Sequence, residues 1–321
     1  MARRLRSLVA LLTTAAALKW HQATAPKSLE TKGKTARCRL RPVDRAVLTL
    51  YRSAIDSRAL DGSAFVDVGY GASPTTTLES ARQFRAFLPS GRDRAAALPA
   101  VGLEQSAERV RVARDAPGAA GVTFHRGGFD VRGSLARADG PPAARVVRAM
   151  NVLRQDYSPA EADRAHAALV SALPTADAVV VEGTCDRFGR LHAVNVLKRR
   201  TDGTPKYDAL IFFASKAALR DGFTPLDLRA VLPKSFIHDC VPGNAVHDFL
   251  AAWDAEWRAA AALHPRARFI RAGERLADAV VGVRRHRRLL TRGFLVWSFD
   301  DASTAADVVF RRKHENAIST K

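Results

Sequence analysis

The chain has 321 residues, 47% of them hydrophobic, which is long enough and apolar enough for a sizeable buried core and excludes a disordered chain. Its formal net charge of +19 would ordinarily indicate nucleic acid or another polyanion as a partner. Residues 1–43 carry ten basic residues and one acidic residue, however, and residues 264–321 carry thirteen and six. The middle of the chain is therefore nearly neutral, and the basic character belongs mainly to the ends.

The three cysteines, Cys38, Cys185 and Cys240, are odd in number and far apart, with no Cys-x-x-Cys pair. This spacing indicates neither a disulfide framework nor a zinc site, so we predict no bound metal and favour a reducing compartment.

The first 40 residues have the composition of a leader or a tail. No acidic residue precedes Glu30, and the apolar run Leu8–Leu18 is too short to span a bilayer. An organelle-targeting peptide, a secretion signal, a disordered tail and a mistaken start codon all fit this pattern. We predict a basic tail or targeting segment over 1–40, a folded domain over 41–300 and a basic tail over 301–321.

The elements of the first half of the domain follow a βα pattern. After a helical lead-in over 43–59, short apolar strands alternate with helical segments, as they do around a parallel sheet. The predicted strands are Ala64–Val68, Ala100–Glu104, Val122–His125, Ala144–Met150 and Ala178–Glu182. The predicted helices are Thr75–Leu88, Ser106–Arg114 and Ser158–Leu173, with starts marked by Ser73-Pro74 and by Ser158-Pro159 followed by Glu161.

The pattern changes after Glu182. Two runs of alternating or continuous apolar residues are separated by the turn-forming segment Thr201-Asp-Gly-Thr-Pro205, and this arrangement predicts a hairpin. The elements predicted here are strands His192–Lys198 and Asp208–Ala214, a helix over Ala245–Leu263, and a last pair of strands at Val280–Val283 and Phe294–Phe299. The hairpin and the helix form an insertion over 190–263 in the domain.

The segment Phe65–Pro74 combines an apolar strand, a Gly-x-Gly turn and a helix start. Gly69 and Gly71 allow a tight turn and the close approach of a ligand, and the helix N-terminus presents free N–H groups. Pro74 stands where a dinucleotide fingerprint has its third glycine, which argues against a pyrophosphate. Glu104 ends the next strand, 33 residues after Gly71 rather than the usual twenty or so, which requires a loop of extra residues.

Asp67-Val-Gly-Tyr-Gly71 resembles motif I of class I S-adenosylmethionine-dependent methyltransferases, and Glu104 resembles the acid that holds the ribose hydroxyls in that class. Three segments, Val68–Glu79, Val147–Gln155 and Val181–Asp186, are similar to a poorly characterised group of these enzymes from high-GC bacteria. The resemblance covers about 41–299. It implies a Rossmann-like α/β sheet, mainly parallel and flanked by helices, and S-adenosyl-L-methionine as cofactor. It implies no particular methyl acceptor.

The residues that the resemblance assigns to the cofactor are Asp67, Gly69, Tyr70, Gly71, Glu104 and Asp130. In the family, an acidic residue after the third strand contacts the adenine amino group. Here Gly127-Gly128 stands at that position, and Phe129 or Asp130 would make this contact instead.

Ligands of open α/β sheets lie outside the carboxyl ends of the strands, and Asn151, Glu182 and Asp186 follow or end two predicted strands. We therefore expect these three residues to face the methyl acceptor; the alternative for Asn151 is a turn-stabilising role. Methyl transfer from a sulfonium depends on alignment more than on acid or base catalysis, so no catalytic dyad is required. Asn151 is not followed by Pro-Pro-Tyr, which argues against the nucleic-acid and glutamine N-methylating subgroups.

Two other functions stay open. An NAD(P)-dependent oxidoreductase shares the strand, turn and helix start, and a non-catalytic basic protein would bind RNA through the ends of the chain or through Arg284–Arg288. Nucleic acid is thus a partner that we do not favour. The cofactor implied by the resemblance is made and kept inside cells, so we expect a cytoplasmic or organellar protein without a membrane span.

Because residues 1–40 have little periodic apolar pattern, we predict that their deletion leaves folding and S-adenosylhomocysteine binding intact. Thermal unfolding and calorimetric titration of the shortened protein check this. Insoluble protein, or protein that no longer binds this nucleoside, would show that the segment belongs to the fold.

Overall fold

The computed structural model describes residues 35–55, 62–88, 93–154, 157–299 and 305–313. The chain divides into two units, residues 1–32 and 33–321, and all described residues belong to the second. Most of the segment predicted as an N-terminal tail lies outside the described residues, as does much of the segment predicted as a C-terminal tail.

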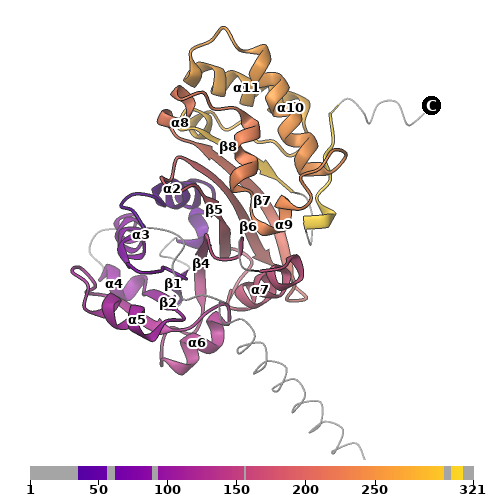
Figure 1. The fold of residues 1–321 in the computed structure, drawn as a ribbon. Coiled ribbons are helices and arrows are strands. Elements are labelled where there is room, and N and C mark those ends of the chain that lie inside the picture. The colour runs from indigo at the N-terminus through magenta and orange to yellow at the C-terminus, as the bar shows by residue number, and fades with distance from the viewer. Residues whose placement is uncertain (1–34, 56–61, 89–92, 155–156, 300–304, 314–321) are drawn as a thin grey trace, which may run out of the picture. The chain divides into compact units, whose positions relative to one another are not determined.

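An eight-stranded sheet in the order β3-β2-β1-β4-β5-β6-β7-β8 forms the centre of the second unit (Figure 1). Its strands are β1 Ala64–Val68, β2 Ala100–Glu104, β3 Val122–Arg126, β4 Ala144–Met150, β5 Val179–Cys185, β6 Leu191–Arg199, β7 Pro205–Ala214 and β8 Phe294–Ser298. Strands β1 to β5 pair in parallel. The pairs β5–β6, β6–β7 and β7–β8 are antiparallel. The order 3-2-1-4-5 is that of a doubly wound fold, which confirms the predicted Rossmann-like sheet.

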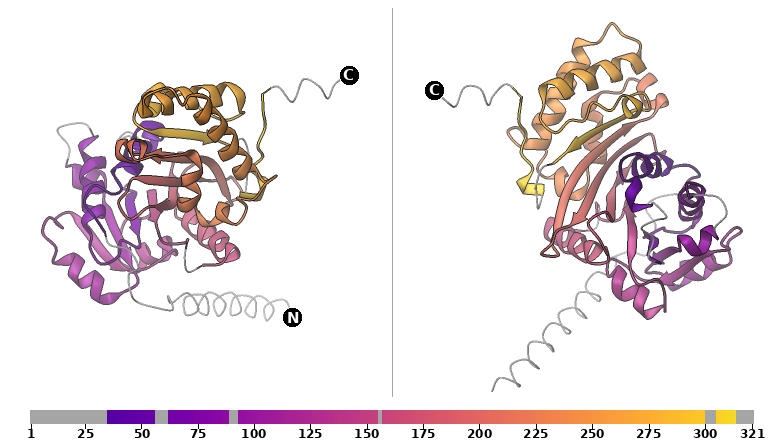
Figure 2. Two further views of the ribbon diagram at one scale, coloured as in Figure 1. Left: turned by 45° about the horizontal axis from the view of Figure 1, so that its top comes forward. Right: turned by 180° about the vertical axis from the view of Figure 1, so that it is seen from behind.

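Helices cover both faces of the sheet (Figure 2). They are α2 Arg41–Leu50, α3 Thr75–Ala86, α4 Arg94–Ala97, α5 Ala107–Arg114, α6 Val131–Arg137, α7 Pro159–Ser171, α8 Lys216–Arg220, α9 Lys234–Ile237, α10 Ala245–Ala259, α11 Pro265–Ala279 and α12 Arg287–Leu290. Three 3₁₀ turns, η1 Arg52–Ala54, η3 Pro225–Val231 and η4 Ala305–Asp307, complete the described elements.

The side chains of β7 alternate between the two faces of the sheet, so this strand packs against a helical layer on each side. Ile211 lies on the face covered by α2, where it lines an apolar crevice with Val43 and Val47. The next residue, Phe212, points to the other face and stacks on Phe249 of α10, with ring centroids 5.5 Å apart. Because successive strand residues face opposite sides, the apolar run in β7 is buried between two helical layers.

Most predicted elements are confirmed to within a few residues, and the differences have local causes. The capping box of α7 forms between Ser158 and Glu161. Helix α3 begins at Thr75 with Pro74 as its N-cap, so Ser73 stands one position further out than predicted. The predicted strand at Val280–Val283 is wrong: α11 ends at Ala279, and Val280 and Val283 each make only an isolated bridge.

Helix α11 itself was not predicted, although its signals are present in the sequence. His264-Pro265 marks the start, and Phe269, Ala272, Gly273, Leu276 and Ala277 form the buried stripe expected of a helix at i, i+3, i+4, i+7 and i+8. Four arginines at the other positions lower the mean hydropathy of the segment, and the apolar stripe is therefore hard to recognise in the sequence.

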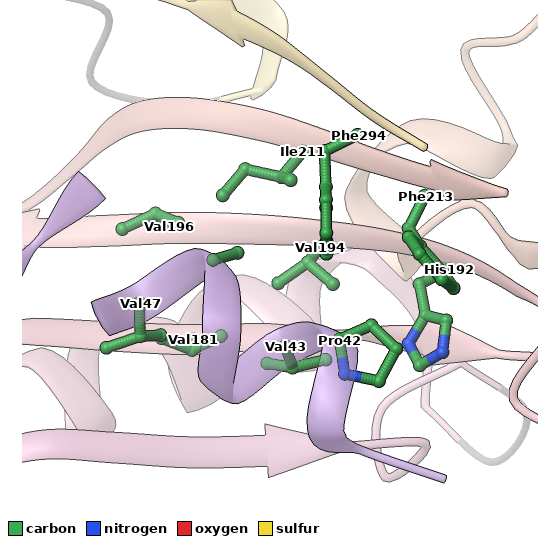
Figure 3. Close-up of a pocket in the computed structure, with 11 residues that line it drawn as sticks. Pro42, Val43, Val47, Val181, His192, Val194, Val196, Ile211, Phe213 and Phe294 are labelled. Atoms are coloured by element: carbon green, nitrogen blue, oxygen red, sulfur yellow. The ribbon is translucent and has the colours of Figure 1, made fainter. Parts of the chain in front are cut away.

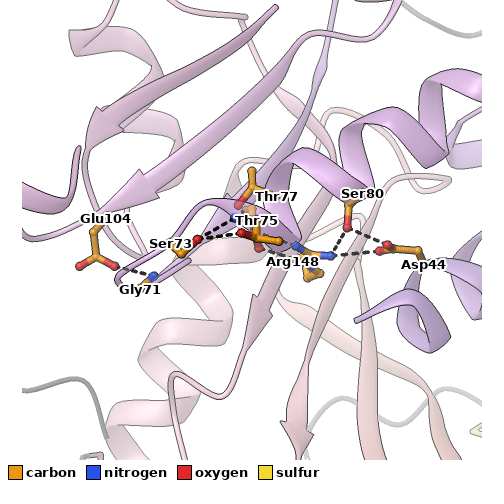
Figure 4. A network of polar contacts seen from close by, with 9 residues as sticks. Asp44, Gly71, Ser73, Thr75, Thr77, Ser80, Glu104 and Arg148 are labelled. Carbon is orange, nitrogen blue, oxygen red and sulfur yellow. Dashed lines mark hydrogen bonds and ion pairs between the residues drawn. The ribbon is translucent and has the colours of Figure 1, made fainter. Parts of the chain in front are cut away.

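A buried polar network joins helices α2 and α3 to strands β1 and β4 (Figure 4). Arg148 of β4 donates from Nε and Nη2 to the two carboxylate oxygens of Asp67 on β1, at 2.9 and 2.7 Å. Its Nη1 donates to Asp44 of α2 at 3.0 Å and to the hydroxyl of Ser80, which in turn donates to Asp44 at 2.7 Å. Thr77 donates to Asp67 at 2.6 Å. One guanidinium thus serves two buried carboxylates.

Burial raises the pKa of the Asp44 carboxyl from its ordinary 3.8 to about 6, because Arg148 and Ser80 offset the loss of hydration only in part. Native Asp44 therefore binds a proton more readily than unfolded Asp44 does. Its contribution to stability is greatest below pH 4 and is lost as the pH rises through about 6.

We predict that the wild type loses up to about 3 kcal/mol of unfolding free energy relative to Asp44→Asn as the pH rises from 4 to 7. Urea unfolding of both proteins across this range measures the difference, and Asp115→Asn, at an exposed position, is the control. A wild type that instead gains stability over the variant with rising pH would mean that Arg148 stabilises ionised Asp44.

Candidate functional site

The turn between β1 and α3 lies at the carboxyl edge of the parallel strands. Gly69 and Gly71 have φ values of +71° and +79°, in the left-handed region that favours glycine. A Cβ on Gly69 would also come within 2.9 Å of Cγ2 of Val152. The Gly69 N–H donates to the carbonyl of Leu103 at 2.8 Å, which holds the turn against the end of β2. Both glycines are therefore required by the backbone here.

Glu104 closes this turn from the neighbouring strand. Its Oε2 accepts from the Gly71 N–H at 3.0 Å, and its Oε1 accepts from the N–H groups of Gln105 and Ser106 at 3.0 and 3.3 Å. Arg109 lies 3.6 Å from Oε1. Glu104 ends β2 as predicted, and its side chain is buried. The carboxylate is already organised by backbone N–H groups before any ligand binds.

Asp67 lies beneath the turn and does not face the edge. Both of its carboxylate oxygens are bound by Arg148, and Thr77 adds a third bond. Because the residue is buried, its carboxylate acts on the turn through β1 and α3.

Tyr70 and Asp130, two further residues predicted to bind the cofactor, have structural bonds of their own. The Tyr70 ring is buried edge-on against Phe124, with centroids 5.3 Å apart, so only its backbone borders the turn. Asp130 is the N-cap of α6: it accepts from the Gly133 N–H at 2.9 Å and pairs with Arg137 at 3.4 Å. Phe129 is buried against Tyr157, with ring centroids 5.4 Å apart. The cofactor roles of Tyr70 and Asp130 stay predictions.

Asn151 follows β4 at the same edge and is exposed. Its φ of +60° lies in the left-handed region, which non-glycine residues adopt chiefly in turns and at functional sites. Its side-chain amide accepts from the Cys185 N–H at 2.9 Å and lies 3.3 Å from Sγ of Cys185. Asn151 therefore joins the ends of β4 and β5. Burial raises the pKa of the Cys185 thiol, which disfavours a nucleophilic role.

Glu182 is not at the edge, and the prediction that it faces an acceptor is wrong. Strand β5 continues to Cys185, so that Glu182 lies inside it and is 0% exposed. Its Oε2 accepts from Asn195 at 3.1 Å and lies 3.4 Å from Nε2 of His166, whose Nδ1 is 3.1 Å from the Tyr207 hydroxyl. These residues form a buried polar cluster under α7, remote from solvent.

Asp186 has a structural role in the turn that joins β5 to β6. Its Oδ1 accepts from the N–H groups of Arg190 and Leu191, at 2.5 and 3.1 Å. Arg39, which lies within the predicted N-terminal tail, donates to the Asp186 carbonyl at 2.9 Å and so attaches the residues before α2 to this turn. The predicted role of Asp186 toward an acceptor has no support in these bonds.

An apolar crevice lies between α2 and strands β5 to β8 (Figure 3). His192 is the polar residue among its lining side chains, and burial lowers its pKa to about 4. The ring is therefore neutral, and its Nε2 donates to the Gly189 carbonyl, 3.1 Å away. The crevice belongs to the core that holds α2, and we assign no ligand to it.

The described residues hold no cluster of metal-binding side chains, since no three His, Cys, Asp or Glu residues among them come together as a metal site would require. Nor does any helix in the described part of the chain have the length and hydrophobicity needed to cross a bilayer.

No family model matches the sequence, and no curated protein does. The structure is similar to several solved methyltransferases. The magnesium protoporphyrin IX methyltransferase ChlM from Synechocystis PCC 6803, with bound SAM, shares 13% identity, covers 55% of this chain and 73% of its own, and has a TM-score of 0.29. The CcbJ methyltransferase from Streptomyces caelestis shares 12% identity, covers 85% and 100%, and has a TM-score of 0.35.

The sugar N-methyltransferase KedS8 from Streptoalloteichus sp ATCC 53650 shares 16% identity, covers 60% of this chain and 76% of its own, and has a TM-score of 0.28.

We predict that Asn151→Gly and Asn151→Ala differ in stability, because Asn151 both bonds to Cys185 through its side chain and has a left-handed backbone conformation. The glycine variant keeps the left-handed backbone and loses the bonds to Cys185, at a cost of about 1 kcal/mol. The alanine variant also pays about 1–2 kcal/mol for the left-handed conformation. Urea unfolding measures both, and equal stability of the two variants would contradict the strained backbone.

Proposed function

We propose that this chain transfers a methyl group from S-adenosylmethionine to an acceptor at the carboxyl edge of β1, β2 and β4. The observation that carries the proposal is the bond between Glu104 and the Gly71 N–H, 3.0 Å long, which joins a glycine turn to a carboxylate on the adjacent strand. This places an anion beside a glycine turn at the carboxyl edge of the sheet, where ligands of open α/β sheets bind.

The residues present fit an adenosyl cofactor. The positive φ values of Gly69 and Gly71 give the turn a backbone path that residues with a Cβ rarely adopt. Glu104 would hold the ribose hydroxyls. A carboxylate has about four acceptor positions, and three N–H groups already occupy Glu104, so contact with two hydroxyls requires that one backbone bond be exchanged.

Asp67 and Arg148 are positioning residues in this proposal. Arg148 holds Asp67, and Asp67 and Thr77 hold the base of the turn, so that the backbone of residues 69–71 keeps its path. Such preorganisation lowers the entropic cost of ligand binding without any contact between these side chains and the ligand.

On the acceptor side, Asn151 is the residue that the geometry favours. It is exposed, strained and next to the turn, since Val152 packs against Gly69. S-adenosylmethionine supplies the electrophilic methyl group when bound. The protein has to align an acceptor in line with that group, and alignment is worth roughly 7–11 kcal/mol of barrier. An exposed polar residue beside the glycine turn is suited to such alignment.

The test is calorimetric titration of S-adenosylhomocysteine into Glu104→Gln, with Glu108→Gln, at an exposed position of α5, as the matched control. Loss of charge-assisted bonds worth roughly 1.5–3 kcal/mol predicts about 10-fold to 100-fold weaker binding for Glu104→Gln only. The same variant should be less stable by about 1–3 kcal/mol, because its new NH₂ group cannot accept from Gln105 and Ser106.

Equal S-adenosylhomocysteine affinity in Glu104→Gln and the wild type would overturn the site. Absence of binding in the wild type would overturn the class, and binding of NADPH in its place would favour the oxidoreductase.

A further inference from the structure

The antiparallel half of the sheet extends the edge on which the glycine turn lies. Strand β6 begins at that edge with Leu191, opposite Ala214 at the end of β7. The Ser215 N–H donates to the Arg190 carbonyl at 2.8 Å, and the Ala214 N–H donates to the Gly293 carbonyl at 2.9 Å. The β5–β6 turn, the start of α8 and the segment before β8 are therefore neighbours along one edge.

These neighbouring segments are densely basic. Their exposed cations are Arg187 in the β5–β6 turn, Lys216 and Arg220 on α8, and Arg287, Arg288 and Arg292 around α12. We call these six residues the basic rim. Within the described residues, none of the six has an acidic partner in an ion pair. Asp186 of the β5–β6 turn accepts from backbone N–H groups, and Asp221 at the end of α8 pairs with Arg190.

An exposed aromatic residue stands at the end of the rim nearest the glycine turn. Phe188 is 64% exposed at the tip of the β5–β6 turn, and the Arg187 guanidinium lies over its ring, 4.9 Å from the centroid. A phenylalanine this exposed contributes little to the core. An aromatic face beside cations is the arrangement on which proteins stack the bases of single-stranded nucleic acids.

We propose that the basic rim and Phe188 bind a single-stranded nucleic acid, with its phosphates along α8 and α12 and a base on Phe188. Neighbouring β-strands lie about 4.8 Å apart, so the sheet edge from β5 to β8 is roughly 14 Å wide. A single-stranded nucleic acid with a phosphate every 3.4 Å or more covers this width with a few nucleotides. An acidic protein would use the charges but would have no need of the aromatic face. An anionic membrane, into which a phenylalanine can insert, is separated from a nucleic acid by the vesicle competition below.

The test is fluorescence anisotropy of a labelled mixed-sequence RNA of about 12 nucleotides, titrated with full-length protein over a range of salt concentrations. The slope of log K against log salt is about −0.7 per phosphate contact, so the six rim residues should contribute about −4 to the total slope. The triple variant Arg287→Gln, Arg288→Gln, Arg292→Gln should reduce the slope by about 2 and weaken binding about 100-fold at 0.1 M salt.

Phe188→Ala should weaken binding about tenfold and leave the slope unchanged, because it removes stacking and no charge. The matched control replaces three exposed arginines on other helices, Arg82, Arg111 and Arg164, by glutamine and should change neither quantity. The basic tails are present in every protein, so the comparison isolates the rim. No cofactor is added, so the outcome is independent of the proposed methyl transfer.

Two results would overturn the proposal. One is a rim variant that binds the RNA as the wild type or the matched control does. The other is displacement of the RNA by phosphatidylserine-containing vesicles together with full affinity in Phe188→Ala, which would make the rim a general anionic-surface site.

Discussion

Arg148 is the charge on which the arrangement of the site depends. It is buried in the middle of β4, where an unpaired guanidinium would be costly, and it is compensated by carboxylates from β1 and α2. Asp67 is bound through two parallel N–H donors, whereas Asp44 shares one donor with Ser80. The stronger pairing is thus directed to the strand that leads into the glycine turn. The weaker one attaches the lead-in helix.

The glycine turn is therefore fixed by two sets of contacts, one at its base and one from the neighbouring strand. Asp67 and Thr77 connect β1 to the first turns of α3, and Glu104 connects β2 to Gly71. A replacement of Arg148 by an apolar residue would leave two buried carboxylates without their cation, which is more destabilising than the loss of one pair implies. The stability of α2, the path of the turn and the position of Glu104 are therefore coupled through one side chain.

The sequence predicted most of this fold because its local signals agree with the tertiary structure. Three strands, Ala64–Val68, Ala100–Glu104 and Ala144–Met150, have the predicted bounds, since each is a short apolar run between clear turn residues. Glu182 was misplaced for a tertiary reason. A charged residue in an apolar run indicates the end of a strand, but Asn195 on the antiparallel partner donates to one oxygen of Glu182 inside the sheet. Likewise, Arg148 in an apolar strand and Asp44 in a lead-in helix are visible individually, while their pairing across 104 residues is not.

The contacts of Glu104 bear on how a site of this kind combines stability with binding. The carboxylate is desolvated and held by backbone donors, which fixes its position before a ligand arrives. The same bonds occupy most of its acceptor positions, so hydroxyl groups compete with the Gly71 N–H for Oε2. The exchange of one hydrogen bond for another is nearly neutral in free energy, whereas leaving the Gly71 N–H without a partner is not. A ligand that also offers an acceptor to the Gly71 N–H would therefore be favoured over one that offers hydroxyls alone, and the turn would contribute to the selection of the ligand through its backbone.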